Sequence, residues 1–270
     1  MNKLLVTSGC SFSSDSQLGE SWPTRLKELG RFDTLINESK PGQSNKLIKL
    51  RLQYKVIELL KVYKPEEITV GVMWTGVDRT AILTDEKEII KTSAKDASEE
   101  GADYLVPFNF VENSKQLWVP LLQDNSYPEL VHKPYYSKIY TKSNAYVEFL
   151  IGVYDLQTFL TNLGISYFMS TAWNVFNFEG DSWWTDKGSF ERYGKLKNTI
   201  IDTDILKDSN YSWIVEQIDF DKFISVEGMW EYCYSINPER DHKIEHHPTG
   251  EEHYKFTEQL ILPQLKIENE

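Results

Sequence analysis

The sequence predicts an α/β fold with three α/β/α layers, in which a central parallel sheet lies between two layers of helices, as in flavodoxin-like proteins. Successive units of strand, loop and helix occupy the chain as far as Trp74. The run Ile68–Trp74 is almost continuously apolar, which is typical of a strand buried on both faces of a parallel sheet. Repeated units of this kind favour a parallel sheet with right-handed crossovers. The 270 residues are expected to form one domain.

The first unit pairs a strand with a polar loop and a helix. Lys3–Ser8 is apolar and β-branched, and it leads into the small polar residues Gly9–Ser13. Ser21 is a candidate N-cap, and Pro23 follows it in the first helical turn. A helix is therefore expected from that cap to Gly30, which ends it.

The second and third units follow the same order. Asp33–Asn37 reads as a short strand, and Pro41–Asn45 breaks the chain. Apolar residues then recur at spacings of three and four between Leu47 and Leu60, which predicts a helix. The buried strand Ile68–Trp74 completes the third unit.

The remainder of the chain is interpreted as an insertion followed by further helices and strands. Residues from about 85 to 138 are acidic and polar with scattered aromatics, and we interpret them as an inserted lid. A long amphipathic helix is expected from Tyr146 to Leu160, closed by Gly164, and a strand over Ile165–Ser170. A last helix is expected over roughly residues 251–267.

Composition argues against two classes of partner. The chain has 29 Lys and Arg against 41 Asp and Glu, and its net charge of −12 offers no surface for a phosphate backbone, so nucleic acid is not expected. No apolar window reaches the roughly 18 residues of a membrane span, so no membrane is expected. The apolar run Leu4–Val6 ends before a signal-peptide core could form. We expect a soluble protein of the cytoplasm, with Cys10 and Cys233 reduced and no cofactor.

Three residue types suited to ester hydrolysis occur in suitable settings. Serine catalysis needs a hydroxyl at the end of a strand, a histidine within hydrogen-bond reach and a carboxylate that orients the imidazole. Ser11 follows the first strand, His247 lies on a loop before Pro248, and Glu245 precedes that histidine by two residues. Asp241 is an alternative orienting carboxylate. The two ends of the chain can meet if the first strand is central in the sheet.

Four short blocks resemble those of the SGNH (GDSL-type) hydrolases. Gly9-Cys10-Ser11-Phe12-Ser13 resembles the family's opening Gly-Asp-Ser block, and Glu245-His246-His247-Pro248 resembles its closing Asp-x-x-His-Pro or Asp-x-His-Pro block. Asn37–Asn45 looks like the second block, and Trp74–Arg79 occupies the place of the third. The form of these blocks is similar to divergent members often encoded by tailed phages, for which a virion location is the alternative to host cytoplasm.

The resemblance implies an oxyanion hole and a substrate-contacting segment. The backbone N–H groups of Ser11 and Gly42 are the implied oxyanion donors. The family's asparagine is missing from the third block, and either Asn45 or Thr75 could take its place. The rest of the third block implies substrate contacts from Trp74, Asp78 and Arg79.

The leading function is hydrolysis of an ester or acetyl ester, with a carbohydrate as one candidate alcohol. The alternative is an inactive SGNH-fold protein that binds glycans or serves as a virion component, since the third block lacks its asparagine. Acyl transfer to a sugar by the same residues is a third possibility. Aromatic side chains that could form a glycan platform, or pack the insertion onto the core, are Trp118, Trp173, Phe176, Phe178, Trp183 and Trp184.

A metal site is not expected, although imidazoles and carboxylates gather near the end of the sequence. Their spacing in the sequence matches no metal-ligand motif that coordination geometry would explain. The residues concerned are Asp241, His242, Glu245, His246, His247 and His253.

Overall fold

A four-stranded parallel sheet forms the centre of the molecule, and the predicted three-layer α/β/α class is confirmed. The computed structural model describes residues 3–16, 18–91, 93, 116–121, 129–176, 211, 213–224, 228–240 and 247–265. The strands lie in the order β2-β1-β3-β6, and their bounds are β1 Leu4–Ser8, β2 Thr34–Asn37, β3 Ile68–Trp74 and β6 Ser166–Thr171. Val6 of β1 pairs with Ile36 on one side and Val70 on the other. β1 is therefore an internal strand, and its carboxyl end has a neighbouring strand on each side.

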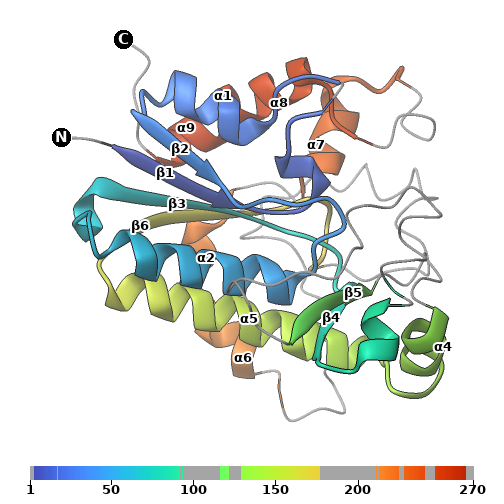
Figure 1. Cartoon of the computed structure of the whole chain (residues 1–270). Coiled ribbons are helices and arrows are strands. Elements are labelled where there is room, and N and C mark those ends of the chain that lie inside the picture. The colour runs from blue at the N-terminus through green and yellow to red at the C-terminus, as the bar shows by residue number, and fades with distance from the viewer. Residues whose placement is uncertain are drawn as a thin grey trace.

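Helices cover both faces of this sheet (Figure 1). One layer contains α1 (Trp22–Leu29) and a C-terminal helical run made of α8 (Gly250–Phe256), the π-helical turn η8 (Thr257–Ile261) and α9 (Leu262–Gln264). The opposite layer contains α2 (Asn45–Leu59) and α5 (Lys142–Asn162). Smaller helices are η1 (Ser11–Ser13), η2 (Pro65–Glu67), α6 (Trp213–Gln217), η7 (Phe220–Lys222) and α7 (Met229–Ile236).

The predicted helix boundaries agree with local chemistry in the structure. Helix α1 has Ser21 as its N-cap residue and a proline within its first turn, and Gly30 caps its end. Helix α5 begins one turn before its predicted start, because the Thr141 side chain accepts a hydrogen bond from the Asn144 N–H. Its end is followed by Gly164 with φ of 70°, a left-handed conformation that favours glycine.

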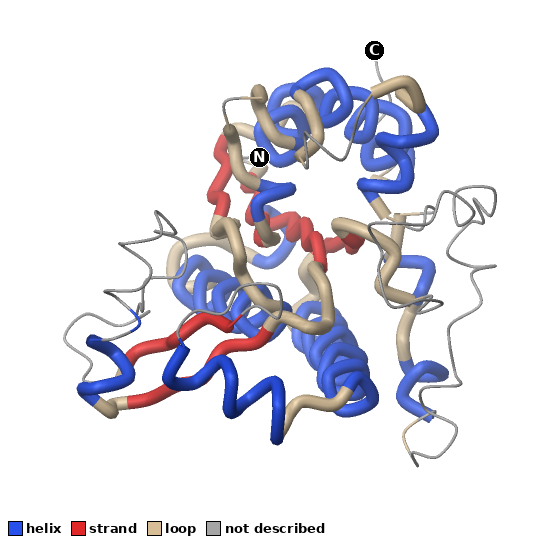
Figure 2. Tube along the Cα trace, turned by 90° about the vertical axis from the view of Figure 1, so that its right-hand side faces the viewer, coloured by secondary structure: helices blue, strands red, loops and turns tan. Residues whose placement is uncertain are grey.

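The predicted insertion contains more regular structure than its sequence pattern indicated. β4 (Thr80–Thr84) and β5 (Leu117–Leu121) form a separate antiparallel pair, apart from the strands of the main sheet (Figure 2), with Ile82 opposite Val119. Helix α4 (Glu129–Lys138) lies near this pair at the carboxyl end of the main sheet (Figure 1). Polar spacing in this region hid both elements, because β5 has only five residues and α4 contains Pro134.

The strand β6 extends the sheet by one further bridge. Met169 forms a parallel bridge with Phe223, and the Ile224 N–H donates to the Met169 carbonyl at 2.9 Å.

Of the helices in the described part of the chain, none is long and apolar enough to cross a membrane.

Candidate active site

The loop after β1 presents Ser11 at the carboxyl end of an internal strand. A Cβ atom on Gly9 would lie 2.3 Å from Ser13 Oγ and 3.2 Å from Met73 Cβ, so this position requires glycine. The chain then turns into η1, where the Ser13 N–H donates to the Cys10 carbonyl at 3.0 Å. Ser11 is the first residue of this short helix, so its N–H has no acceptor within the helix.

Ser11 and His247 meet, although they are 236 residues apart in sequence. The Ser11 Oγ atom lies 2.8 Å from His247 Nε2, a distance typical of a strong hydrogen bond. The imidazole packs against the Phe12 ring at a centroid distance of 5.5 Å. Phe12 in turn contacts Trp173 at 5.7 Å and Trp230 at 6.2 Å. The two residues predicted to form a nucleophile and base are therefore in contact beside an aromatic cluster.

A buried ion pair fixes the loop that carries His247. The guanidinium of Arg240 donates to the His247 carbonyl at 2.7 Å and also pairs with the Glu252 carboxylate. The side chains of Arg240 and Glu252 are 9% and 3% exposed. Glu252 also accepts from the Thr249 N–H at 2.7 Å, which completes a capping box at the start of α8. Sequence reasoning missed this support, although Thr249 followed three residues later by Glu252 is a capping-box signature.

A second link joins the C-terminal helical run to the first helix of the chain. The Trp22 N–H donates to Nδ1 of the buried His253 at 3.2 Å. Burial lowers the pKa of His253 to about 3, with Asp15 opposing the shift, so the imidazole is neutral at pH 7. Asp15 accepts from the Ser21 N–H at 2.7 Å and from the Thr24 hydroxyl at 3.1 Å, which stabilises the start of α1.

The loop that contains Gly42 is anchored to the end of β1. Lys40 to Gln43 form a turn with Pro41 at its second position and Gly42, at φ of 67°, in its third, as type II turns require. Gln43 donates from Nε2 to Ser8 Oγ at 3.1 Å and to the Gly9 carbonyl at 3.2 Å. These bonds bring the loop against the residues that precede Ser11.

The structure gives Asn45 a different role from the expected oxyanion donor. Its Nδ2 atom donates to the carbonyls of Thr75 at 2.9 Å and Gly76 at 3.3 Å. Its Oδ1 atom accepts from the Thr75 N–H at 2.8 Å. Both hydrogens of the Asn45 amide are thus engaged by backbone carbonyls. The expectation that this amide donates to the oxyanion is therefore wrong. Asn45 instead joins the start of α2 to the end of β3.

Thr75 keeps a hydroxyl that is not engaged by the described part of the chain. The residue is fully buried, and its Oγ1 atom has no hydrogen-bond partner there. A buried hydroxyl without a partner is unfavourable by about 1–3 kcal/mol. Thr75 therefore remains the side-chain donor that could supplement the backbone N–H groups.

The structure contradicts the expected substrate contact of Trp74. This residue is the last of β3 and is fully buried. Its Nε1 atom donates to Met169 Sδ at 3.4 Å, and its ring packs edge-on against Phe149 at 5.9 Å. Trp74 is therefore a core residue that substrate cannot reach.

Asp78 and Arg79 lie beyond β3, where the chain passes toward β4. Asp78 is half-buried, and its backbone carbonyl accepts from the Tyr136 hydroxyl at 2.7 Å. The Arg79 guanidinium lies over the Trp173 ring at 5.0 Å. Arg79 is thereby next to the aromatic cluster that contacts His247.

Among the aromatic residues singled out from the sequence, the three that the structure describes do not form one platform. Trp173 and Phe176 are buried in the core, where Phe176 contacts Phe149 at 5.5 Å and Phe223 at 5.3 Å. Trp118 is half-buried beneath the Lys46 ammonium at 5.0 Å. The residues of the earlier predictions that lie outside the described part of the chain are Asp241, His242, Glu245, His246, Phe178, Trp183 and Trp184.

The described residues contain no group of three or more His, Cys, Asp or Glu side chains arranged to bind a metal ion.

Comparison with protein-family models, curated proteins and solved structures finds no match to this chain.

Proposed function

We propose that the protein is a serine esterase of the SGNH kind, with Ser11 as nucleophile and His247 as general base. The observation on which this rests is the 2.8 Å contact between Ser11 Oγ and His247 Nε2. Such a contact lets the imidazole take the hydroxyl proton as the oxygen attacks. The four sequence blocks that resemble the family support the same proposal, as does a nucleophile at the carboxyl end of a parallel strand.

The proposed reaction proceeds through an acyl-enzyme. Ser11 Oγ attacks the ester carbonyl carbon and transfers its proton to His247 Nε2. The tetrahedral intermediate then collapses, the bond to the alcohol breaks, and the alcohol leaves with the proton from His247. Water attacks the acyl-enzyme by the same route, which releases the acid and restores the Ser11 hydroxyl. Glu245, with Asp241 as the alternative, would orient the imidazole.

Two backbone groups are candidates to stabilise the negative charge of the intermediate. Within the described part of the chain, neither the Ser11 N–H nor the Gly42 N–H donates to another residue. Both groups belong to loops joined to the end of β1. Each preorganised donor of this kind contributes about 10²–10³ in rate in a well-studied protease.

Replacement of Ser11 by alanine tests the proposal, and Ser14→Ala is a matched control that removes another hydroxyl from the same loop. We expect Ser11→Ala to lower kcat for 4-nitrophenyl acetate by about 10³-fold or more, whereas Ser14→Ala protein should retain most of the wild-type kcat. A stoichiometric burst of 4-nitrophenol from wild type would report the acyl-enzyme. Equal turnover by Ser11→Ala protein would overturn the mechanism.

A second candidate function is glycan binding without turnover. It is favoured by the engagement of Asn45, which leaves no side-chain amide of that residue for the oxyanion. In that case glycan affinity would persist in Ser11→Ala and His247→Ala proteins, and no variant or wild type would release acid from an acetylated glycan.

The cysteines support a reducing compartment such as the cytoplasm as the place of action. Cys10 and Cys233 are both buried free thiols. Burial raises the pKa of Cys233 well above its usual value, which makes that thiol inert.

A further inference from the structure

We propose that a cavity beside the candidate active site binds an anionic group, a carboxylate or a phosphate, and that the ester substrate carries this group. The first part concerns binding alone. The second part, which names the substrate class, rests on the proposed esterase function.

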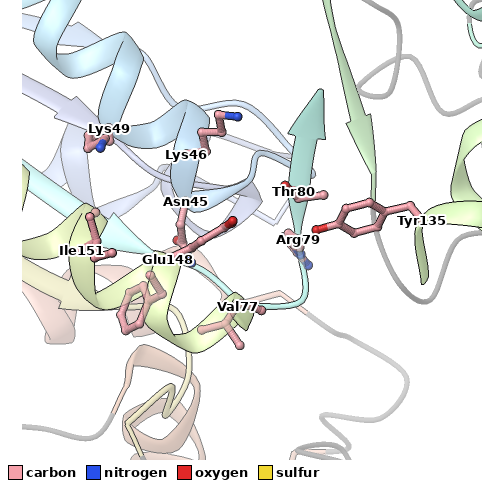
Figure 3. A pocket seen from close by; sticks show the side chains of 12 residues that line it. Asn45, Lys46, Lys49, Val77, Arg79, Thr80, Tyr135, Glu148 and Ile151 are labelled. Carbon is pink, nitrogen blue, oxygen red and sulfur yellow. The ribbon is translucent and has the colours of Figure 1, made fainter. Parts of the chain in front are cut away.

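The cavity lies between helices α2 and α5 and the strand β4. Its volume is about 260 Å³, slightly below the range of about 300–1,000 Å³ typical of sites for drug-sized ligands. It therefore suits one small group rather than a whole polymer. The polar and charged side chains that line it are Asn45, Lys46, Lys49, Arg79, Thr80, Tyr135 and Glu148 (Figure 3).

Its charge is opposite in sign to that of the whole chain. Three cationic residues, Lys46, Lys49 and Arg79, face one carboxylate, Glu148, so the lining has a formal charge of +3 − 1 = +2. Lys49 also pairs with Asp155 at 2.9 Å, which leaves Lys46 and Arg79 as the cations with no ion pair inside the described part of the chain. A positive cavity in a protein of net charge −12 indicates an anionic ligand.

Arg79 provides the most specific feature of this cavity. Its Nη1 atom is buried and has no hydrogen-bond partner among the described residues. The Arg79 Cζ atom lies over the Trp173 ring, 5.0 Å from its centroid, and this cation–π contact helps to hold the guanidinium in place. A guanidinium whose Nη1 atom has no partner within the described part of the chain is suited to donate to an oxygen of a carboxylate or phosphate.

Other donors face the same space. Asn45 and Lys46 are the first two residues of α2, so the positive end of a helix of 15 residues lies at the cavity. Thr80 and Tyr135 add two hydroxyl groups, which are hydrogen-bonded to each other. Burial raises the pKa of Tyr135, which keeps its phenol protonated as a donor. The lining therefore combines charge with neutral donors, as anion sites do.

A chain of ring contacts connects this cavity with the candidate catalytic pair. Arg79 stacks on Trp173, Trp173 contacts Phe12 at 5.7 Å, and Phe12 contacts His247 at 5.5 Å. An ester whose carbonyl carbon is at Ser11 would thus direct its acidic group toward the β3 side of the sheet edge.

Binding is tested first, without turnover, in Ser11→Ala protein titrated with inorganic phosphate and, separately, with succinate by calorimetry. We expect one of the two anions to bind, and its identity distinguishes phosphate from carboxylate. Arg79→Gln should weaken this binding about tenfold, as expected for loss of a charged hydrogen-bond partner. Lys46→Gln, at an exposed side chain, gives a second test that does not depend on Arg79, which is half-buried.

Two further variants separate a local effect from a general one. Glu148→Gln removes the carboxylate of the lining and should tighten anion binding severalfold. Lys61→Gln makes the same charge change as Lys46→Gln at an exposed position just after the end of α2, and should leave the affinity unchanged. Absence of binding by both anions, or equal weakening by Lys61→Gln, would overturn the inference.

Turnover then tests the substrate class. We expect wild type to hydrolyse mono-4-nitrophenyl succinate with a kcat/KM at least tenfold above that for neutral 4-nitrophenyl acetate, and Arg79→Gln to abolish this preference, mainly through KM. Anion binding with no hydrolysis of either ester would refute the esterase proposal, while the proposed anion-binding site would still be supported. Hydrolysis of both esters without any preference would refute the substrate class.

Discussion

Arg240 donates from Nη2 to the backbone carbonyl of His247 at 2.7 Å, so the loop of the candidate base is fixed through its main chain. The same guanidinium pairs with Glu252, which caps the following helix. His247 is thereby coupled to the start of α8 rather than left on an unsupported turn. This makes Arg240 a positioning residue for the proposed reaction.

We expect Arg240→Lys to retain the charge opposite Glu252 but lose the bond to His247, because an ammonium cannot reproduce the two-sided guanidinium. The predicted result is a drop of about tenfold in kcat with little change in KM, from a loss of about 1.4 kcal/mol in positioning. Arg240→Gln should in addition lower the free energy of unfolding by about 3–5 kcal/mol, since Glu252 is left buried and unpaired. Urea titration and ester kinetics measure the two effects. A wild-type kcat for Arg240→Lys would show that the contact is only structural.

Gly42→Ala and Gly164→Ala form a matched pair. Both glycines have left-handed backbone, with φ of 67° and 70°, so each substitution should lower the free energy of unfolding by about 1–2 kcal/mol. Gly164 lies at the amino end of β6, whereas Ser11 follows the carboxyl end of β1, so the two residues are at opposite ends of the parallel strands. A Cβ on Gly164 would meet nothing within 4 Å. Only Gly42→Ala should lower kcat, because only that turn presents a proposed oxyanion donor. Equal kcat values for the two variants would remove Gly42 from the oxyanion hole.

His253 should make stability fall with acid. Its pKa is about 3 in the folded protein against 6.5 for an ordinary histidine, so between these values the unfolded chain binds a proton that the folded protein does not. Its contribution is complete above pH 6.5 and is lost by about 1.4 kcal/mol per pH unit as pH falls toward 3.

His253→Asn keeps an acceptor for the Trp22 N–H but cannot be protonated, so it isolates this effect. We expect urea titrations at pH 5, 6 and 7 to show a shallower loss of stability in the variant than in wild type. The variant will be less stable at pH 7, because asparagine fills less of the buried site. Parallel curves for the two proteins would mean that His253 is not the group responsible.

Asn45→Asp tests the connection between α2 and the end of β3. The carboxylate would face the carbonyls of Thr75 and Gly76, which now accept from the amide. We expect the free energy of unfolding to fall by about 1–3 kcal/mol. Asn162→Asp, the same change at an exposed position of α5, should cost less than about 1 kcal/mol. Similar losses in both variants would argue that the Asn45 bonds contribute little.

The main sheet and its helices could be predicted because their boundaries depend on nearby residues. Ser21, Pro23 and Gly30 mark one helix from within a few positions, and the apolar run Ile68–Trp74 defines a strand without reference to the rest of the chain. Residues 117–121 and 129–138 were missed since a short strand and a helix containing proline leave little periodicity.

The site was predictable only in part. The contact between Ser11 and His247 followed from block order, whereas Trp74 was misassigned because its block gives no information on which way a strand-end side chain faces. The bond between Trp22 and His253 joins residues 231 apart and leaves no local pattern. Such contacts depend on packing between layers, which periodicity does not report.

The link between the two ends of the chain bears on how the protein folds. Besides the Trp22 bond to the His253 side chain, the Gly250 N–H donates to the Leu18 carbonyl at 2.9 Å. The start of α1 and the loop before it are therefore joined to α8 across most of the sequence. Closing so long a loop is entropically unfavourable, and contacts of high sequence separation form slowly. Pairing of β1 with its neighbours can precede this closure, whereas the meeting of Ser11 with His247 cannot. On dilution from denaturant, secondary structure should therefore return before the contact between Ser11 and His247, so the refolding chain passes through a stage that is ordered but lacks the candidate site.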